Sequence, residues 1–289
     1  MKQLSPTDSQ MLFIETDASP NQIAPLSIYD PSTAPGGKVT HKGILSLLES
    51  RLHLAPAFRR KLQRVPFDID EPYWVDDPNF SLEYHVHHLA LPKPGDWRQL
   101  CIMVARLVAR PLDPSRPMWE MYIIEGLDNV EGFPKGCFAT LLKIHHSMVD
   151  GKAGVAIINA LHDLAPIAAG AELQIPQEWQ AEASPSTMDL TSTSLKRLMF
   201  KPGQIAKVLS RTVPSLISSR NLRKSKPSLR VPNTPLNGEI TAPRVFDARR
   251  YKLDDFKAIR KLVPGATIND AALAVVGGGM RRYLEAKNV

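Results

Sequence analysis

Two adjacent histidines, His145 and His146, are the residues of this chain whose types and spacing most directly suggest chemistry. They lie in the stretch KIHHSMVDGKAG, where Asp150 follows the second histidine by four positions and Gly151 comes next. A neutral imidazole can accept a proton from an alcohol near neutral pH, because its ordinary pKa lies close to that value. The stretch is therefore a candidate for general-base catalysis.

The same residues also have structural interpretations. Two histidines can simply be packed, Asp150 can cap the N-terminus of a following helix, and Gly151 can allow a tight turn. A metal site is a weaker alternative, because His, His and Asp this close in sequence supply few convergent ligands, and we expect none. From spacing alone, His145 and His146 could be packed or catalytic, and packing is the favoured interpretation.

The elements around the histidines are predicted as a strand, a turn and a helix. The run CFATLLKI at 137–144 is rich in β-forming residues, and KAGVAIINALHDL at 152–164 has helical spacing. Val155, Ile158 and Leu161 would lie on its inward face. If extended backbone continues through both histidines, their side chains point to opposite faces, so one addresses a given cavity and the other supports it.

The rest of the chain alternates helical and strand-like patterns, which indicates an α/β protein. Helices are predicted at 41–52, 96–110, 254–262 and 267–284, and strands at 82–91, 118–127 and 244–253. Residues 166–242 are rich in Pro, Ser and Thr and contain one amphipathic stretch, as expected of a linker. We therefore divide the chain into 1–165, the linker 166–242, and 243–289.

Composition favours a cytoplasmic protein. The chain has 289 residues, 43% of them hydrophobic, and it contains neither a membrane-length apolar run nor an apolar secretory signal near its start. Its two cysteines, Cys101 and Cys137, lack metal-type spacing and are expected to be buried as small hydrophobic residues.

The formal charge of +7 is concentrated in one segment. No acidic residue occurs from 190 to 238, where there are ten basic ones: Lys196, Arg197, Lys201, Lys207, Arg211, Arg220, Arg223, Lys224, Lys226 and Arg230. The segment 195–230 could contact an anionic membrane or lipid inclusion, or it could be a solvated linker. We do not expect nucleic acid binding, because aromatic stacking residues are nearly absent there.

The histidine stretch resembles a known signature. HHSMVDG fits the His-His-x-x-x-Asp-Gly motif of the CoA-dependent acyltransferase superfamily, which includes chloramphenicol acetyltransferases and condensation domains. The stretches LSPTDSQMLFIE, RPMWEMYIIEGL and TINDAALAVVGGGMRRYL are similar to motifs of bacterial wax ester synthase/acyl-CoA:diacylglycerol acyltransferases, in the same order. The resemblance implies a two-lobe fold like that of chloramphenicol acetyltransferase.

This resemblance also implies roles for the site residues. His146 would be the general base that deprotonates a long-chain alcohol or diacylglycerol as its oxygen attacks the thioester of an acyl-CoA. His145 and Asp150 would hold the loop and orient the base, with support from Gly151. Acyl-CoA would be a substrate, and no cofactor is expected.

Four further residues fall in the family's motifs and are candidates for substrate binding or loop support: Trp119, Glu120, Asn269 and Asp270. Trp119 also fits a core position, and Thr267 with Asp270 fits a helix capping box, which we favour as the role of Asp270. His85 and His87 share one face of a predicted strand and are expected to face solvent.

Two other functions stay open at this point. One is a catalytically silent, basic module that binds lipid surfaces, and the other is a condensation-type enzyme that joins amines. Members of the family continue with most of a second lobe after the Asn-Asp helix, so this chain would contain the first lobe and the start of the second. The protein would be cytoplasmic or peripheral on the inner membrane or on lipid inclusions.

Overall fold

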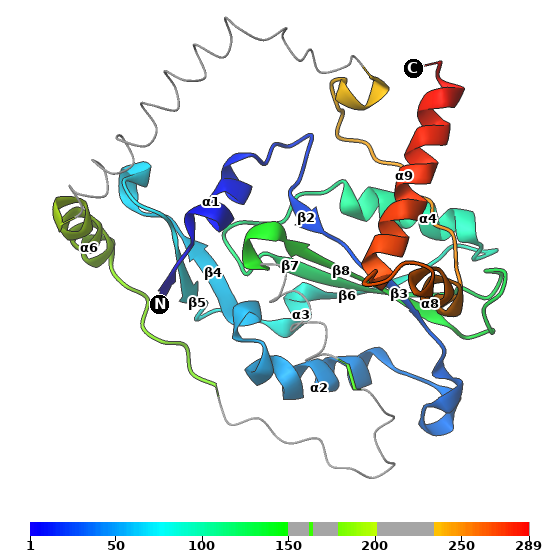
Figure 1. Ribbon diagram of the computed structural model, residues 1–289. Coiled ribbons are helices and arrows are strands. Elements are labelled where there is room, and N and C mark those ends of the chain that lie inside the picture. Colours follow the sequence, from blue (N-terminus) through cyan, green and yellow to red (C-terminus); the bar gives the residue numbers. More distant parts are fainter. Residues whose placement is uncertain (150–161, 164–178, 201–233, 289) are drawn as a thin grey trace, which may run out of the picture. The chain divides into compact units, whose positions relative to one another are not determined.

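The computed structural model describes residues 1–149, 162–163, 179–200 and 234–288 (Figure 1). Asp150, Gly151, most of the predicted helix 152–164 and most of the basic segment lie outside the described residues. The described residues divide into two units: 234–240 with 247–288 form the second, and the rest, including 241–246, form the first.

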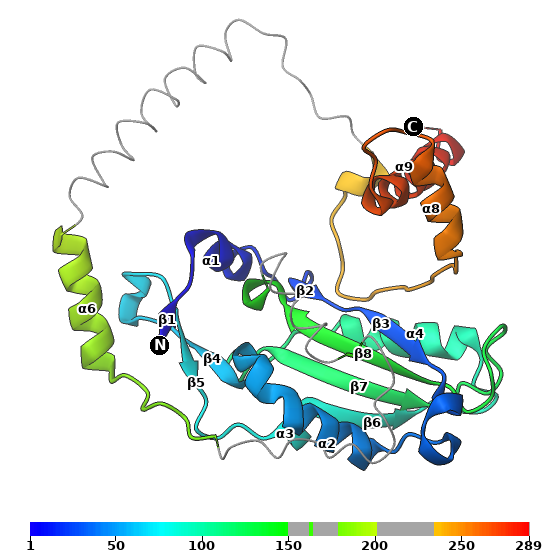
Figure 2. The same cartoon turned by 60° about the horizontal axis from the view of Figure 1, so that its bottom comes forward.

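A five-stranded mixed sheet forms the centre of the first unit. Its strands are β2 (Gln22–Ile23), β3 (Leu26–Tyr29), β6 (Val86–Ala90), β7 (Trp119–Glu125) and β8 (Phe138–His145). The order is β2-β8-β7-β6, and β3 also pairs with β8. β7 and β8 are antiparallel, whereas β6 runs parallel to β7 (Figure 2). The two predicted central strands are thus adjacent.

Alternation along β7 and β8 gives the sheet two apolar faces. One face packs with α2 (His41–Arg51) through Leu48, and the other packs with α4 (Trp97–Val108) through Leu100 and Val104. The predicted helices 41–52 and 96–110 are confirmed with slightly narrower bounds. Asp96 begins α4 with a capping box to Gln99, which explains where this helix starts.

A second, three-stranded sheet completes the first unit. It has the order β1-β5-β4, formed by β1 (Lys2–Gln3), β5 (Tyr73–Asp76) and β4 (Arg60–Gln63). α6 (Thr187–Phe200) packs on it, with Leu190 buried against Val65 and Val75. Part of the segment expected to be a linker is therefore a helix that belongs to this unit.

The strand predicted at 82–91 is confirmed in its second half as β6, whereas residues 82–85 form a one-turn helix, α3 (Leu82–His85). The strand predicted at 244–253 is wrong, because no strand is present there. His85 is 4% exposed and not solvent-facing. Its ring stacks on Trp119 with centroids 4.7 Å apart, and its Nδ1–H donates to the Trp119 carbonyl over 2.8 Å. Packing against a distant tryptophan outweighs the local alternation.

The second unit contains α8 (Leu253–Lys261) and α9 (Ile268–Ala286), and both predicted helices are confirmed. Both carry exposed apolar residues, among them Ile259 on α8 and Leu273 and Val276 on α9. Across the described part of the chain, no helix has both the length and the apolar character needed to cross a bilayer.

Candidate active site

The histidine pair stands where β8 ends. His145 is the last residue of the strand, and His146 begins a short 3-10 turn, His146–Met148. The His145 backbone N–H donates to the Met118 carbonyl, and that of His146 donates to the Asn21 carbonyl, each over 2.9 Å. The turn is thus fixed from both sides, by the residue before β7 and by the one before β2.

The His145 ring is held inside the protein, with 1% of the residue exposed. The Ser147 backbone N–H donates to its Nδ1 over 3.1 Å, so Nδ1 is the unprotonated nitrogen. Nε2–H then donates to Glu15 Oε2 over 3.2 Å. Burial lowers the pKa of this ring, and the opposing effect of Glu15 is smaller. Burial therefore favours the neutral form of His145.

Glu15 is itself positioned by the N-terminal segment. Its other oxygen, Oε1, accepts the Asn21 backbone N–H over 3.1 Å, and the Asn21 side-chain amide donates to the Met11 carbonyl over 2.8 Å. Glu15 therefore orients His145, while Asn21 holds the backbone of His146. Sequence reasoning missed both roles, although Glu15 ends the motif LSPTDSQMLFIE.

His146 is half-buried, unlike its neighbour. The backbone of His145 is extended, with φ −64° and ψ 139°, so alternation continues and the two side chains leave on opposite faces. His146 follows Leu142 and Ile144 on the face that α2 covers. None of the described residues forms a hydrogen bond with its ring in this structure.

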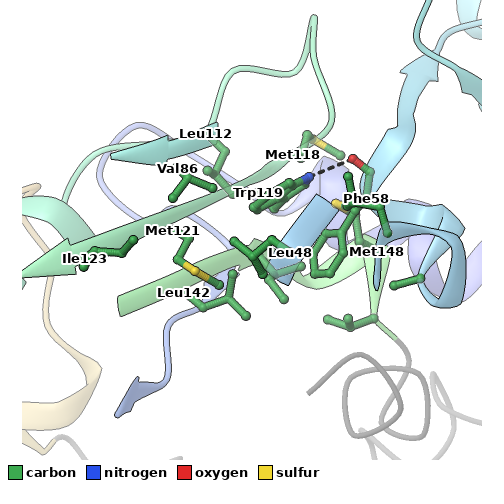
Figure 3. Close-up of a cluster of buried hydrophobic side chains, with 14 residues drawn as sticks. Leu48, Phe58, Val86, Leu112, Met118, Trp119, Met121, Ile123, Leu142 and Met148 are labelled. Atoms are coloured by element: carbon green, nitrogen blue, oxygen red, sulfur yellow. Dashed lines mark hydrogen bonds between the residues drawn. The ribbon is translucent and has the colours of Figure 1, made fainter. Parts of the chain in front are cut away.

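Trp119 lies in the core beneath this turn. It is 2% exposed, its Nε1–H donates to the Phe58 carbonyl over 2.8 Å, and its ring lies 4.5 Å from that of Phe58 (Figure 3). Its register partner on β8 is Ile144, directly before the histidines. The structure thus buries Trp119 beside the residue that precedes the histidines, with its one polar side-chain atom satisfied by the protein.

Glu120 points to the opposite face, into a buried polar network. Its Oε2 accepts from Lys143 Nζ over 3.1 Å and from the Tyr122 hydroxyl over 2.6 Å, while Lys143, fully buried, also donates to the Arg110 carbonyl. Burial lowers the pKa of Lys143 and raises that of Tyr122. The network joins β7, β8 and the end of α4, so its described contacts are structural.

Asn269 and Asp270 belong to the second unit, at the start of α9. Asp270 Oδ2 accepts the Thr267 backbone N–H over 2.7 Å, and the Thr267 hydroxyl accepts the Asp270 N–H over 3.2 Å. The predicted capping box is confirmed. The hydrogen bonds that the Asp270 carboxylate accepts from the Thr267 hydroxyl and backbone N–H lower the pKa of Asp270. Asn269 is exposed. Over the described ranges, no group of three His, Cys, Asp or Glu side chains could hold a metal ion.

Comparison with known proteins now identifies the family. The family described as wax ester synthase/diacylglycerol acyltransferase catalytic domain matches residues 4–272. The chain belongs to this family. A solved wax ester synthase/diacylglycerol acyltransferase from Marinobacter aquaeolei VT8 is 26% identical, with a TM-score of 0.65 over 99% of this chain and 62% of that one. The α/β fold expected from the resemblance is confirmed.

Curated relatives of the wax ester synthase/diacylglycerol acyltransferase family differ in how much of them this chain spans. A Mycobacterium tuberculosis H37Rv protein named a diacylglycerol O-acyltransferase is 32% identical over 98% of this chain and 55% of its own length. Another from the same strain, tgs3, is 30% identical over 89% of this chain and 94% of its own length. The chain thus spans little more than half of the first relative and nearly all of the second.

The buried histidines of this family member predict how its stability depends on pH. Burial lowers the pKa of His85 and His145, so the folded protein keeps both neutral where the unfolded chain, with an ordinary pKa near 6.5, binds protons. Lowering the pH below that value therefore favours unfolding, by at most about 1.4 kcal/mol per pH unit for each histidine.

Urea unfolding should show this loss of stability when it is measured from about pH 7.5 to about pH 5.5, roughly one pH unit on either side of the ordinary histidine pKa. His85→Gln should reduce the pH dependence, whereas His53→Gln, at an exposed position, should leave it unchanged. Stability that rises as the pH falls through this range would contradict the account.

Proposed function

We propose that this chain is the catalytic part of an acyl-CoA-dependent O-acyltransferase that makes wax esters or triacylglycerol. The observation that carries the proposal is a half-buried His146 at the end of a buried strand, with a neighbouring imidazole oriented by Glu15. Membership of the family supports the reaction, and the names of the relatives support the choice of a diacylglycerol or alcohol acceptor.

In the proposed mechanism, His146 takes the proton of the acceptor hydroxyl as its oxygen bonds to the thioester carbonyl carbon. The carbonyl re-forms as the carbon–sulfur bond breaks, and the proton passes from His146 to the departing CoA thiolate. The products are an ester and free CoA, so a covalent acyl-enzyme is not needed. Burial lowers the pKa of His145, so the ring beside the base favours its neutral form.

Release of CoA thiol tests the activity. The native chain is supplied with palmitoyl-CoA alone and with hexadecanol, a diacylglycerol or hexadecylamine, and the lipid product is identified by mass. We expect thiol release that depends on the alcohol or the diacylglycerol and yields the matching ester. Release that is the same with and without an acceptor would contradict the proposal.

The same assay separates the two alternative functions. A catalytically silent lipid-binding module would bind palmitoyl-CoA without releasing thiol, and a condensation-type enzyme would prefer the amine and form an amide. We favour the O-acyltransferase, because the PMWE and IND stretches belong to the family that the chain matches over residues 4–272.

We also propose that the basic segment attaches the protein to anionic lipid surfaces, which hold both the acceptor and the product. Each basic residue near such a surface contributes roughly 1 kcal/mol. The tested change neutralises four residues to glutamine: Arg220, Arg223, Lys224 and Lys226.

Binding to phosphatidylserine vesicles should weaken by more than about tenfold, since four such contacts are removed. Raised salt should have a similar effect on the native chain. The matched control neutralises four exposed residues outside the segment, Arg260 and Lys261 on α8 and Arg281 and Arg282 on α9. Equal weakening by the control, or none by the fourfold change, would refute attachment through the segment.

A further inference from the structure

A cavity of about 320 Å³ lies between α2 and the central sheet. Its floor is formed by alternate residues of two paired strands, Ser27 and Tyr29 on β3 and Phe138, Thr140 and Leu142 on β8. Volumes of about 300–1,000 Å³ are typical of sites that hold small molecules. The cavity is therefore large enough for a small ligand.

Most of the wall is apolar. Ile44, Leu47 and Leu48 line it from α2, and Met121 lines it from β7. Leu48 and Met121 also belong to the buried cluster of Figure 3. An alkyl chain that packs against these side chains leaves water, and each buried methylene tightens binding about fourfold. The wall thus favours a ligand with a long alkyl chain.

Two hydroxyl groups interrupt the apolar floor. Ser27 and Thr140 are register partners on β3 and β8, so their side chains lie next to each other on the face that lines the cavity. Both residues are half-buried. Each hydroxyl can donate one hydrogen bond and accept others. A hydroxyl on a ligand has the same two capacities and therefore matches this pair.

The charged side chains of the wall favour an uncharged ligand. Arg51 and Asp163 both line the cavity and form an ion pair with each other, and the Arg51 side chain is 12% exposed. A carboxylate bound here would compete with Asp163 for Arg51, and separating a largely buried ion pair is costly. A neutral hydroxyl leaves the pair intact.

We propose that this cavity is a binding site for a long-chain primary alcohol, with its hydroxyl at Ser27 and Thr140 and its alkyl chain against α2. His146 is not one of the described residues that line the cavity. The alcohol bound there is therefore not the molecule that His146 deprotonates in the proposed reaction, and the inference does not rest on that reaction.

Equilibrium dialysis with radiolabelled 1-decanol, without acyl-CoA, tests the site. The double variant Ser27→Ala/Thr140→Val removes both hydroxyls with little change of volume, so it should bind decanol about tenfold more weakly, because two hydrogen bonds are lost. Native protein should bind 1-dodecanol on the order of tenfold more tightly than decanol, since two more methylenes are buried. It should bind decanoate more weakly than decanol. Equal binding of decanol by native protein and the double variant, tighter binding of decanoate, or no binding by native protein would overturn the proposal.

Three single variants locate the bound alcohol. Ser27→Trp places an indole in the cavity and should abolish decanol binding, whereas Ser32→Trp, at an exposed position outside the cavity, should leave it unchanged. His146→Ala should also bind decanol as tightly as native protein. Binding that persists in Ser27→Trp, or that is lost in His146→Ala, would overturn the proposal. Failure of the proposed reaction is seen separately, as a native protein that binds decanol as expected but releases no thiol from palmitoyl-CoA.

Discussion

Replacing His146 by alanine is expected to lower the rate of acyl transfer by about a hundredfold to ten-thousandfold, which corresponds to roughly 3–5 kcal/mol of activation free energy. The reason is that the acceptor hydroxyl would lose the base that removes its proton. The loss should appear in kcat, while KM for palmitoyl-CoA changes little, because the ring acts on the acceptor and not on the CoA moiety. Thiol release at saturating substrates measures it.

Two matched variants make this result specific. His53→Ala removes an exposed imidazole and should leave the rate unchanged. His145→Ala should lower the rate and also the free energy of unfolding, because it removes a buried ring bonded to Ser147 and Glu15. His146→Ala, at a half-buried position, should affect stability much less. A His146→Ala protein that unfolds as readily as His145→Ala would indicate a packed residue and not a base.

Replacing Trp119 by alanine is expected to cost about 3–5 kcal/mol of unfolding free energy. The ring is 2% exposed, belongs to the cluster of Figure 3 and packs against the Phe58 ring. It also stacks on the ring of His85. Its loss would leave a cavity and would remove the donor that satisfies the Phe58 carbonyl. Urea unfolding followed by circular dichroism measures the effect without relying on tryptophan fluorescence.

Graded substitutions separate the two contributions of Trp119. Trp119→Phe keeps most of the apolar volume and loses the hydrogen bond, so it should cost about 1–3 kcal/mol. Trp179→Ala removes a half-buried ring whose described contact is the Arg59 guanidinium 4.7 Å from its centroid, and it should cost about 1 kcal/mol. A loss for Trp119→Ala no larger than that for Trp179→Ala would show that Trp119 does not anchor the core.

Local periodicity predicted the elements in which the pattern of apolar residues in the element's own sequence determines which side chains are buried. β7 and β8 are apolar runs buried on both faces, and α4 carries one apolar stripe behind a capping residue, so each shows its burial in its own sequence. The sequence of α3 does not show its burial, because His85 is buried through contacts with Trp119, which lies 34 positions away in the chain. Residues 244–253 alternate like a strand, but none of the described strands pairs with them.

The candidate site also has features that the local sequence predicted and features that depend on distant residues. Alternation through an extended backbone predicted that His145 and His146 point apart, and the backbone of His145 is extended. The partner of His145 could not be predicted, because Glu15 lies 130 positions earlier and reaches the ring only after α1 (Pro6–Phe13) docks beside the turn. Glu120 was a candidate by motif alone, and only the register with Lys143 shows what it contacts.

In the proposed reaction the imidazole of His146, and not that of His145, takes the proton of the acceptor. Chemical rescue tests it most directly: ester synthesis from palmitoyl-CoA and hexadecanol is measured in His146→Ala and His145→Ala proteins with increasing free imidazole. The account predicts that imidazole restores synthesis in the His146→Ala protein in proportion to its concentration and does not restore it in the His145→Ala protein. Native rates in His146→Ala without imidazole, or rescue of His145→Ala instead, would contradict it.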